Sequence, residues 1–190
     1  MTTQNEEINP AEFQCEDPPL NLRPDPLAPE RIKLQAKYGF TATISSEWDD
    51  IAQEVVNEFG GPEVGGIAGV NHIDAERNQV FVGVAGYDIR GMNCFQGACS
   101  TLITRDPLKD YTALAFNDLL DFPLFASNDM VTKFGKRTYI GALILPPERI
   151  GIGTVWWVGS DPREWRQYNL DFMKSKAAKV MNRLRERSGQ

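Results

Sequence analysis

The residues best suited to chemistry in this sequence are its three cysteines and its single histidine. A cysteine thiolate attacks electrophiles and exchanges disulfides, and an imidazole moves protons near neutral pH. Cys15, Cys94 and Cys99 form an odd set without the paired spacing of a zinc site, and His72 adds only one further ligand. A histidine-based catalytic triad would have to use His72. We therefore predict free thiols in a reducing compartment and no metal site.

A second group of polar residues stands at the ends of two strand-like runs. Asn117 and Asp118 follow one run, and Arg137 and Tyr139 alternate at the start of another. Because side chains alternate along a strand, Arg137 and Tyr139 share one face, and either could line a cavity. Arg137 could instead form a structural ion pair with an acid such as Asp118 or Asp121. Both interpretations stay open at this point.

These residues are positioned by two apolar runs, 135–145 and 150–160, which a turn with two prolines and two charges separates. Each run contains a stretch of about eight residues rich in β-branched and aromatic side chains, which favours strands over helices. The short connection predicts an antiparallel hairpin. Gly141, inside the first run, is expected where another group approaches the backbone closely.

Periodicity predicts the other elements. A helix over 45–59 is favoured by serine N-caps and by a stripe of apolar residues on one face, namely Trp48, Ile51, Ala52, Val55, Val56 and Phe59. Further strands are expected over 66–74, 78–86 and 111–116, and short helices over 29–40 and 95–103. In the strand 78–86, alternation predicts that Val80, Val82 and Val84 lie on one face.

Three segments around the hairpin carry a family resemblance. They are Arg137-Thr138-Tyr139-Ile140-Gly141-Ala142-Leu143, Ile152-Gly153-Thr154-Val155 and Asp161-Pro162-Arg163. Together they resemble the C-terminal signature of GAF domains, in which an Arg-x-Tyr-x-Gly-x-Pro-Leu strand and an Ile-Gly-Thr-Leu strand precede an Asp-x-Pro-Arg entry to the last helix. The proline before Leu143 is missing. The resemblance covers about residues 40–188. It implies an α+β fold, with a GAF/PAS-like central antiparallel sheet of five or six strands flanked by helices.

The resemblance also implies a site. In GAF domains a short helix with a Ser-x-Cys-like pattern often covers the ligand cavity, and Cys99 occupies the corresponding place. The family commonly has an acidic residue where the third strand ends, which points to Asn117 and Asp118. With Arg137 and Tyr139, these residues make up the predicted ligand-binding set. The resemblance does not identify the ligand, and the cofactor is unknown.

Three functions agree with such a chain. The first is a small-molecule-binding sensory or regulatory domain, and it is the function that we predict. Because 190 residues leave no room for a kinase, cyclase or DNA-binding output domain, we expect its output to pass through a signalling partner or a dimer. The second is a thiol-based reductase of free methionine sulfoxide that uses Cys94 and Cys99. The third is a dimerising scaffold without a ligand.

Charge and proline content divide the chain into a flexible arm, 1–28, and one domain, 29–190. Residues 1–30 hold seven acids and one base, which leaves nineteen acids and nineteen bases in the rest of the chain. Six of the twelve prolines lie between residues 10 and 29, and such a segment buries too little surface to offset its ordering entropy. A neutral body argues against a nucleic-acid partner.

The sequence gives no sign of a membrane or of secretion. No apolar run reaches the ~18 residues that a membrane span needs, and the first residues contain neither a basic region nor an apolar core. We therefore predict a cytoplasmic protein with no membrane partner.

The last helix is expected to begin at Asp161, with Pro162 at its first position and Glu164 completing a capping box. It carries more apolar residues than one sheet face readily buries. We assign Trp165, Tyr168 and Phe172 to the core of the domain. The remaining stripe predicts a homodimer seam and consists of Leu170, Met173, Ala177, Val180 and Leu184. The alternative is that this stripe packs against the helix 45–59 of the same chain.

Overall fold

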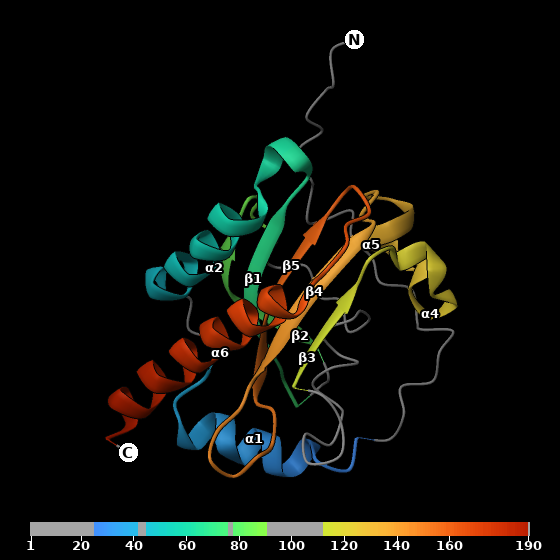
Figure 1. The fold of residues 1–190 in the computed structure, drawn as a ribbon. Coiled ribbons are helices and arrows are strands. Elements are labelled where there is room, and N and C mark those ends of the chain that lie inside the picture. The colour runs from blue at the N-terminus through green and yellow to red at the C-terminus, as the bar shows by residue number, and fades with distance from the viewer. Residues whose placement is uncertain (1–24, 42–44, 76–77, 91–111, 190) are drawn as a thin grey trace.

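The computed structural model describes residues 25–41, 45–75, 78–90 and 112–189 (Figure 1). The helices are α1 (Ala28–Lys37), α2 (Ser46–Phe59), α4 (Pro123–Ala126), α5 (Asp129–Thr132) and α6 (Gln167–Ser188), with short 3-10 turns η2 (Pro62–Val64) and η3 (Leu119–Asp121). The strands are β1 (Ile67–Ile73), β2 (Gln79–Ala85), β3 (Ala113–Phe116), β4 (Thr138–Ile144) and β5 (Gly153–Gly159).

Within these ranges the strands form one five-stranded sheet in the order β2-β1-β5-β4-β3. Every neighbouring pair is antiparallel. β4 and β5 make the predicted hairpin, in which Ile140 lies opposite Trp157, and β1 and β2 make a second one. The α+β fold with a central antiparallel sheet of five or six strands is therefore confirmed.

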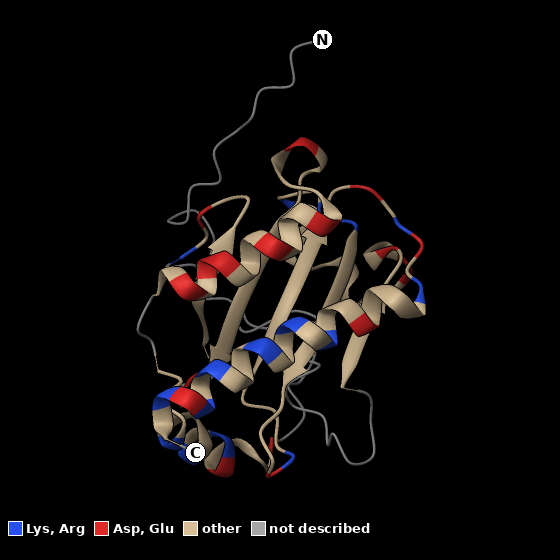
Figure 2. Cartoon of the chain, turned by 60° about the vertical axis from the view of Figure 1, so that its left-hand side comes forward, with Lys and Arg blue, Asp and Glu red and all other residues tan. Residues whose placement is uncertain are grey.

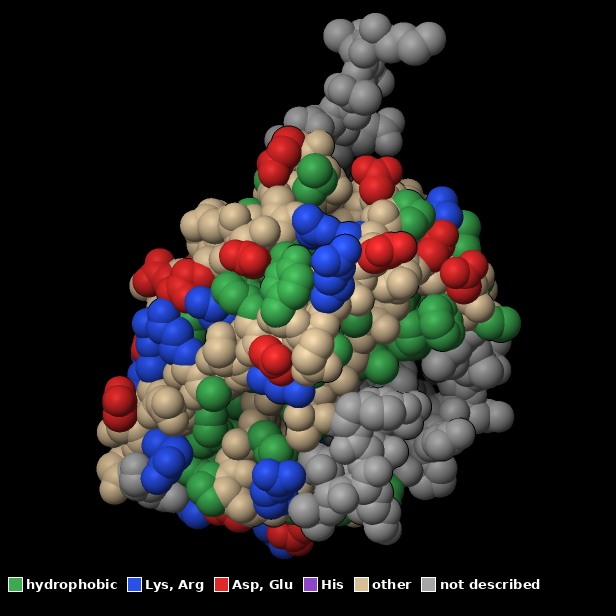
Figure 3. All heavy atoms as spheres, viewed as in Figure 1, with side chains coloured by type: hydrophobic (Ala, Val, Ile, Leu, Met, Phe, Trp, Pro, Cys, Tyr) green, Lys and Arg blue, Asp and Glu red, His purple; other side chains and the backbone are tan. Residues whose placement is uncertain are grey.

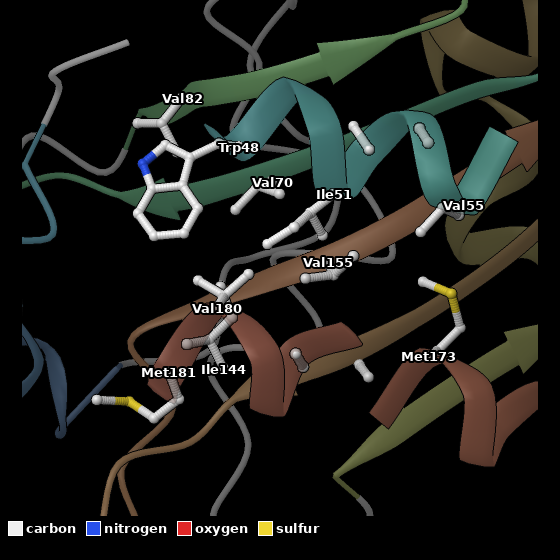
Figure 4. Packing of buried hydrophobic residues seen from close by; sticks show 14 of the residues in the cluster. Trp48, Ile51, Val55, Val70, Val82, Ile144, Val155, Met173, Val180 and Met181 are labelled. Carbon is white, nitrogen blue, oxygen red and sulfur yellow. The ribbon is translucent and has the colours of Figure 1, made fainter. Parts of the chain in front are cut away.

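One face of the sheet, which we call the helix face, is covered by α2 and α6 (Figure 1). α2 packs on β1, β2 and β5, while α6 packs on β3, β4 and β5. In Figure 4 the side chains of both helices point into the layer that holds Val70 and Val155 of the sheet. All six residues of the stripe predicted for α2 are buried there, which are Trp48, Ile51, Ala52, Val55, Val56 and Phe59.

The predicted dimer seam on the last helix is wrong. Met173, Val180 and Leu184 are each 0% exposed within a single chain and belong to the core under the helix face (Figure 4). A sheet of five strands is wide enough for two helices, so the stripe of α6 fills the part of the face that α2 leaves open. Tyr168, which we had assigned to the core, is 63% exposed.

Ion pairs join α6 to α2 along their length. Figure 2 shows acidic residues along α2 and basic residues along α6. Glu54 pairs with Lys176 at 2.7 Å and also with Lys179. At the other end, Glu47 pairs with Arg183 at 3.1 Å and with Arg187. The basic residues of α6 are therefore largely neutralised within the chain.

α1 closes one end of the sheet, where the β1–β2 and β4–β5 connections lie (Figure 1). Gln35 donates hydrogen bonds from its amide nitrogen to the carbonyl oxygens of Ile73, at 3.1 Å, and Ile152, at 2.9 Å. Arg31 is 1% exposed and donates from Nε to the carbonyl of Gly151 at 2.9 Å. Its guanidinium also pairs with Asp25, so folded contacts begin before the predicted domain boundary at residue 29.

The last helix begins at Gln167 rather than at Asp161, so the predicted start and its capping box are wrong. The preceding segment is held by Asn117 from the end of β3. The backbone N–H of Arg163 donates to the carbonyl of Asn117 at 2.9 Å, and the N–H of Trp165 donates to its side-chain oxygen at 3.1 Å. These bonds replace helical ones, and Arg166 with Asn169 caps the helix instead.

Among the described residues, α6 is the longest helix. Neither α6 nor any other helix in the part of the chain that the structure describes is long and apolar enough to cross a membrane.

Candidate functional site

The face of the sheet opposite α2 and α6, called the site face below, is built from residues that strand alternation turns away from the helices. The strand register arranges them in three rows across the sheet. The first row is Ile67, Val158, Tyr139 and Phe116; the second is Val84, Gly69, Trp156, Gly141 and Leu114; the third is Phe81, Asn71, Thr154 and Leu143.

Two glycines in the middle row make room for large aromatic side chains. A Cβ added to Gly69 would stand 2.7 Å from Cζ2 of Trp156. A Cβ added to Gly141 would stand 2.2 Å from the hydroxyl oxygen of Tyr139. Real Cβ atoms do not approach so closely, so the indole and the phenol both lie against the backbone of the sheet. The close approach predicted at Gly141 is confirmed.

The indole nitrogen of Trp156 is buried and has no hydrogen-bond partner among the described residues. Two other tryptophans behave differently. Trp157 donates from Nε1 to the carbonyl of Gly60 at 2.9 Å, and Trp165 donates to Thr138 Oγ1 at 2.9 Å. Because buried polar groups are almost always paired, the Trp156 N–H is a hydrogen-bond donor that awaits an acceptor.

Buried polar side chains of the third row are joined by hydrogen bonds. Thr154 donates to the side-chain oxygen of Asn71 at 2.5 Å, and the Asn71 amide donates to Gln79 at 3.2 Å. The strand pairing shifts between Val70 and Asn71, which marks a bulge in the β1–β2 ladder. The bulge also moves Val84 to the site face, while Val80 and Val82 stay with the helix face, so the prediction of one common face was wrong.

Apolar side chains from the turns between β3 and β4 border the site face. Leu119 of η3, Phe125 of α4 and Val131 of α5 are buried in the same cluster as Trp156 and Tyr139. Figure 3 shows hydrophobic side chains at the surface in the part of the molecule where Figure 1 places α4. Nearby, Leu120 is 47% exposed and Phe122 is 40% exposed.

The predicted residues at the strand ends form an ion pair at the edge of the sheet. Arg137 donates from Nε to Asp118 at 2.9 Å and binds its second oxygen as well. The hydrogen bond to Arg137 lowers the pKa of Asp118, and the same bond raises the pKa of Arg137. The structural ion pair proposed from the sequence is therefore confirmed. Asn117 holds the segment before α6, and of the described residues in the predicted set Tyr139 alone lies in the three rows.

Lys136, next in sequence to Arg137, was missed by sequence analysis. It is 4% exposed, and its ammonium donates to the carbonyl of Gly65 at 2.6 Å and lies 5.8 Å from the ring centre of Tyr87. Burial lowers the pKa of Lys136 to about 8. No sequence signal marks it, because its burial depends on Gly65, which lies 71 residues earlier.

The candidate residues for thiol chemistry cannot be placed on this face. Cys15, Cys94 and Cys99 lie outside the described residues, as does the helix predicted over 95–103. His72 packs against Phe40, with 5.3 Å between ring centres, and burial lowers its pKa. Within the described ranges no group of three or more His, Cys, Asp or Glu residues could hold a metal ion.

Solved structures that resemble this chain share its fold. The GAF domain of an Acinetobacter phosphoenolpyruvate-protein phosphotransferase has a TM-score of 0.58 at 7% identity and covers 84% of this chain and 94% of its own. The GAF domain of Thermosynechococcus elongatus PixJ, in its blue-light absorbing form, has a TM-score of 0.55 at 11% identity and covers 81% of this chain and 88% of its own. A type II free methionine-R-sulfoxide reductase from Thermoplasma acidophilum has a TM-score of 0.57 at 13% identity and covers 79% of this chain and 96% of its own.

These likenesses show that the chain has a GAF-like fold, as the sequence resemblance implied. At such low identity they concern the fold and leave the activity open. No protein-family model matches the chain, and no curated protein sequence matches it.

Proposed function

We propose that this chain is a cytoplasmic sensory or regulatory domain that binds a small molecule on the site face and passes the signal to a partner protein. The observation that carries the proposal is the buried N–H of Trp156 in the middle of that face, which has no partner among the residues that the structure describes. Ligand sites typically combine apolar and aromatic walls with a few placed polar groups, and the site face has this composition. Its GAF-like fold is shared with the GAF domain of a phosphoenolpyruvate-protein phosphotransferase and with the blue-light absorbing GAF domain of PixJ.

The end of β3 supplies a route from the site face to α6. Phe116 lies on the site face, and its carbonyl accepts a hydrogen bond from the indole of Trp165 at 3.2 Å. Its neighbour Asn117 holds Arg163 and Trp165 just before α6 begins. A ligand that displaces Phe116 would therefore shift the start of α6. In this proposal Tyr139 contacts the ligand, while Asn117 transmits its presence.

A thermal-shift screen of the purified chain, with native mass spectrometry for any copurified ligand, tests the proposal. A true ligand should raise the melting temperature and slow amide exchange in β3, β4 and β5. Exchange changes confined to residues 45–60 would place the binding site on α2 and contradict the proposal.

A homodimer through the C-terminal helix stays a prediction, and it now has to use the outer surface of α6. Tyr168, at 63% exposed, is the large apolar residue on that surface. Light scattering at tens of micromolar protein should report a dimer that Tyr168→Glu converts to folded monomers. A wild-type monomer under these conditions would contradict the dimer and leave the signal to a different partner.

A thiol-based reductase is the second candidate function, because the similar structures include a free methionine-R-sulfoxide reductase from Thermoplasma acidophilum. It requires Cys94 and Cys99 as the reacting thiols. Reduction of free methionine sulfoxide by the wild type, lost in both Cys94→Ser and Cys99→Ser, would support it. A wild type without this activity would remove the enzyme from consideration.

A further inference from the structure

The site face favours a particular class of ligand, and its first indication is the orphan donor. Trp156 is 3% exposed and its Nε1 has no acceptor in the described structure. An indole N–H only donates, so it selects a ligand atom with a free lone pair. The ligand must therefore present a hydrogen-bond acceptor to Trp156, such as an unprotonated ring nitrogen or a carbonyl oxygen.

The second indication is the set of aromatic rings around this donor. Phe81 meets Trp156 edge to face, with 5.9 Å between ring centres. The ring centres of Phe116 and Tyr139 are 6.2 Å apart, and the phenol of Tyr139 lies against the backbone at Gly141. Aromatic side chains prefer offset or edge-to-face contacts with other rings. A flat ring system satisfies such surroundings better than a flexible or branched molecule does.

The third indication is the absence of charge from the three rows. None of the thirteen residues that form them carries a charged side chain at neutral pH. The polar groups of the third row are already bonded, because Thr154 donates to Asn71 and the Asn71 amide donates to Gln79 beside the row. Burying a ligand charge against such a surface would be costly, so the part of the ligand that lies there is uncharged.

We propose that the ligand is an uncharged aromatic heterocycle whose ring nitrogen or ring carbonyl accepts a hydrogen bond from Trp156 Nε1. The proposal deepens the proposed function and rests on it. It assigns Trp156 the role of a specificity-determining residue, because a hydrocarbon of the same shape would leave the N–H unpaired. A site built to hydrogen-bond its ligand discriminates strongly against analogues that lack the partner atom.

Three bicyclic probes of nearly equal size separate the contributions at pH 8. Quinoline carries a ring nitrogen with a free lone pair, naphthalene has none, and N-methylquinolinium is charged and has none. We expect quinoline to bind the wild type and N-methylquinolinium not to bind. In Trp156→Phe, quinoline affinity should fall about tenfold or more while naphthalene affinity stays within about twofold.

Indole ¹H–¹⁵N spectra give a second readout that works on the wild type. Quinoline should shift one indole signal downfield as the new hydrogen bond forms. The indole of Trp157 already donates to the carbonyl of Gly60 on the helix face and serves as the internal reference. Trp157→Phe is the matched control, because it removes an indole that is bonded to Gly60 on the helix face and should leave quinoline affinity unchanged.

The inference is overturned if quinoline fails to bind at millimolar concentration, if no indole signal moves, or if Trp156→Phe weakens both neutral probes equally. The proposed function has a separate outcome. If the thermal-shift screen finds a charged or non-aromatic compound that protects β3 to β5, the sensory proposal stands and the inference about the ligand class fails. If the screen finds no ligand at all, both the sensory proposal and the inference about the ligand class fail.

Discussion

Two neighbouring tryptophans show how differently the two faces of the sheet are built. Trp157 points to the helix face, where its indole donates to Gly60 and its ring packs 5.9 Å from Phe59 and 5.7 Å from Trp165. Trp156 points to the site face, where its indole has no partner among the described residues. The indole on the helix face is satisfied, whereas the indole on the site face has no acceptor among the described residues. In the proposed function, this contrast between the two indoles leaves the helix face to stabilise the fold and the site face to bind a ligand.

The largest effect is expected from a charge placed under the helix face. Val180→Glu would bury a carboxylate at a position that is 0% exposed, and the chain should lose more than about 4 kcal/mol of unfolding free energy. Urea denaturation measures this loss. Ala178→Glu, on the exposed side of the same helix, should change stability by less than about 0.5 kcal/mol. If Val180→Glu were a stable, folded monomer, Val180 would have to lie on the outer surface of α6, as the predicted dimer seam required.

A smaller but still large effect is expected at the end of the sheet that α1 closes. Asp25 is the partner of Arg31, and their side chains are 7% and 1% exposed. Asp25→Ala removes a carboxylate that pairs with a buried guanidinium, which should cost about 3 kcal/mol and lower the melting temperature by roughly 6–12 °C. Deletion of residues 1–24 keeps the pair and should leave the melting temperature nearly unchanged. Equal effects of the two changes would show that the pair contributes little.

The paired substitutions Trp156→Phe and Trp157→Phe measure the contrast between the faces directly. Both remove one indole N–H and a similar volume. Trp157→Phe also leaves the Gly60 carbonyl without its donor, so it should be the more destabilising by about 1–2 kcal/mol. Chemical denaturation of both variants against the wild type gives the difference. Equal losses would mean that the Trp156 indole already has a partner.

The smallest effect concerns pH and the ion pairs between α2 and α6. Hydrogen bonds from Lys176 and Lys179 lower the pKa of Glu54. Its contribution is therefore fully present above the ordinary glutamate value of about 4.3 and is lost as the pH falls through the lower folded value. Because the Glu54 side chain is 35% exposed, we expect less than about 1 kcal/mol. Glu54→Gln should flatten that part of the stability profile; an unchanged profile would contradict the assignment.

Local periodicity was sufficient to predict the elements that carry a complete pattern of their own. The α2 stripe from Trp48 to Phe59 and the hairpin of β4 and β5 both follow the sequence. The α6 stripe was equally visible, but its partner was misassigned. Periodicity shows that Val180 and Leu184 must be buried, and it does not show whether a sheet or a second helix buries them.

Features that depend on distant residues escaped prediction. The start of α6 depends on Asn117, which lies 48 residues before Trp165. The bulge at Val70 and Asn71 moves Val84 to the other face, and its sign in the sequence of β2 is Gly83, which pairs with Val70. Of the site face, Tyr139 was predicted, while Trp156 was missed. Glycine inside a strand was the available signal, since Gly69 and Gly141 stand in register on either side of Trp156.

The packing of α1 against the end of the sheet has a consequence for how the chain folds during synthesis. α1 leaves the ribosome well before its anchors, since Gly151 and Ile152 follow 120 and 117 residues after Arg31 and Gln35. At about 5–20 residues per second, the wait is roughly 6–24 s, and an isolated helix of this length is marginal in water. Nascent chains arrested before Gly151 should be cut by protease within residues 28–37, whereas released chains should resist. The first of the described helices in chain order is thus among the last to find its place.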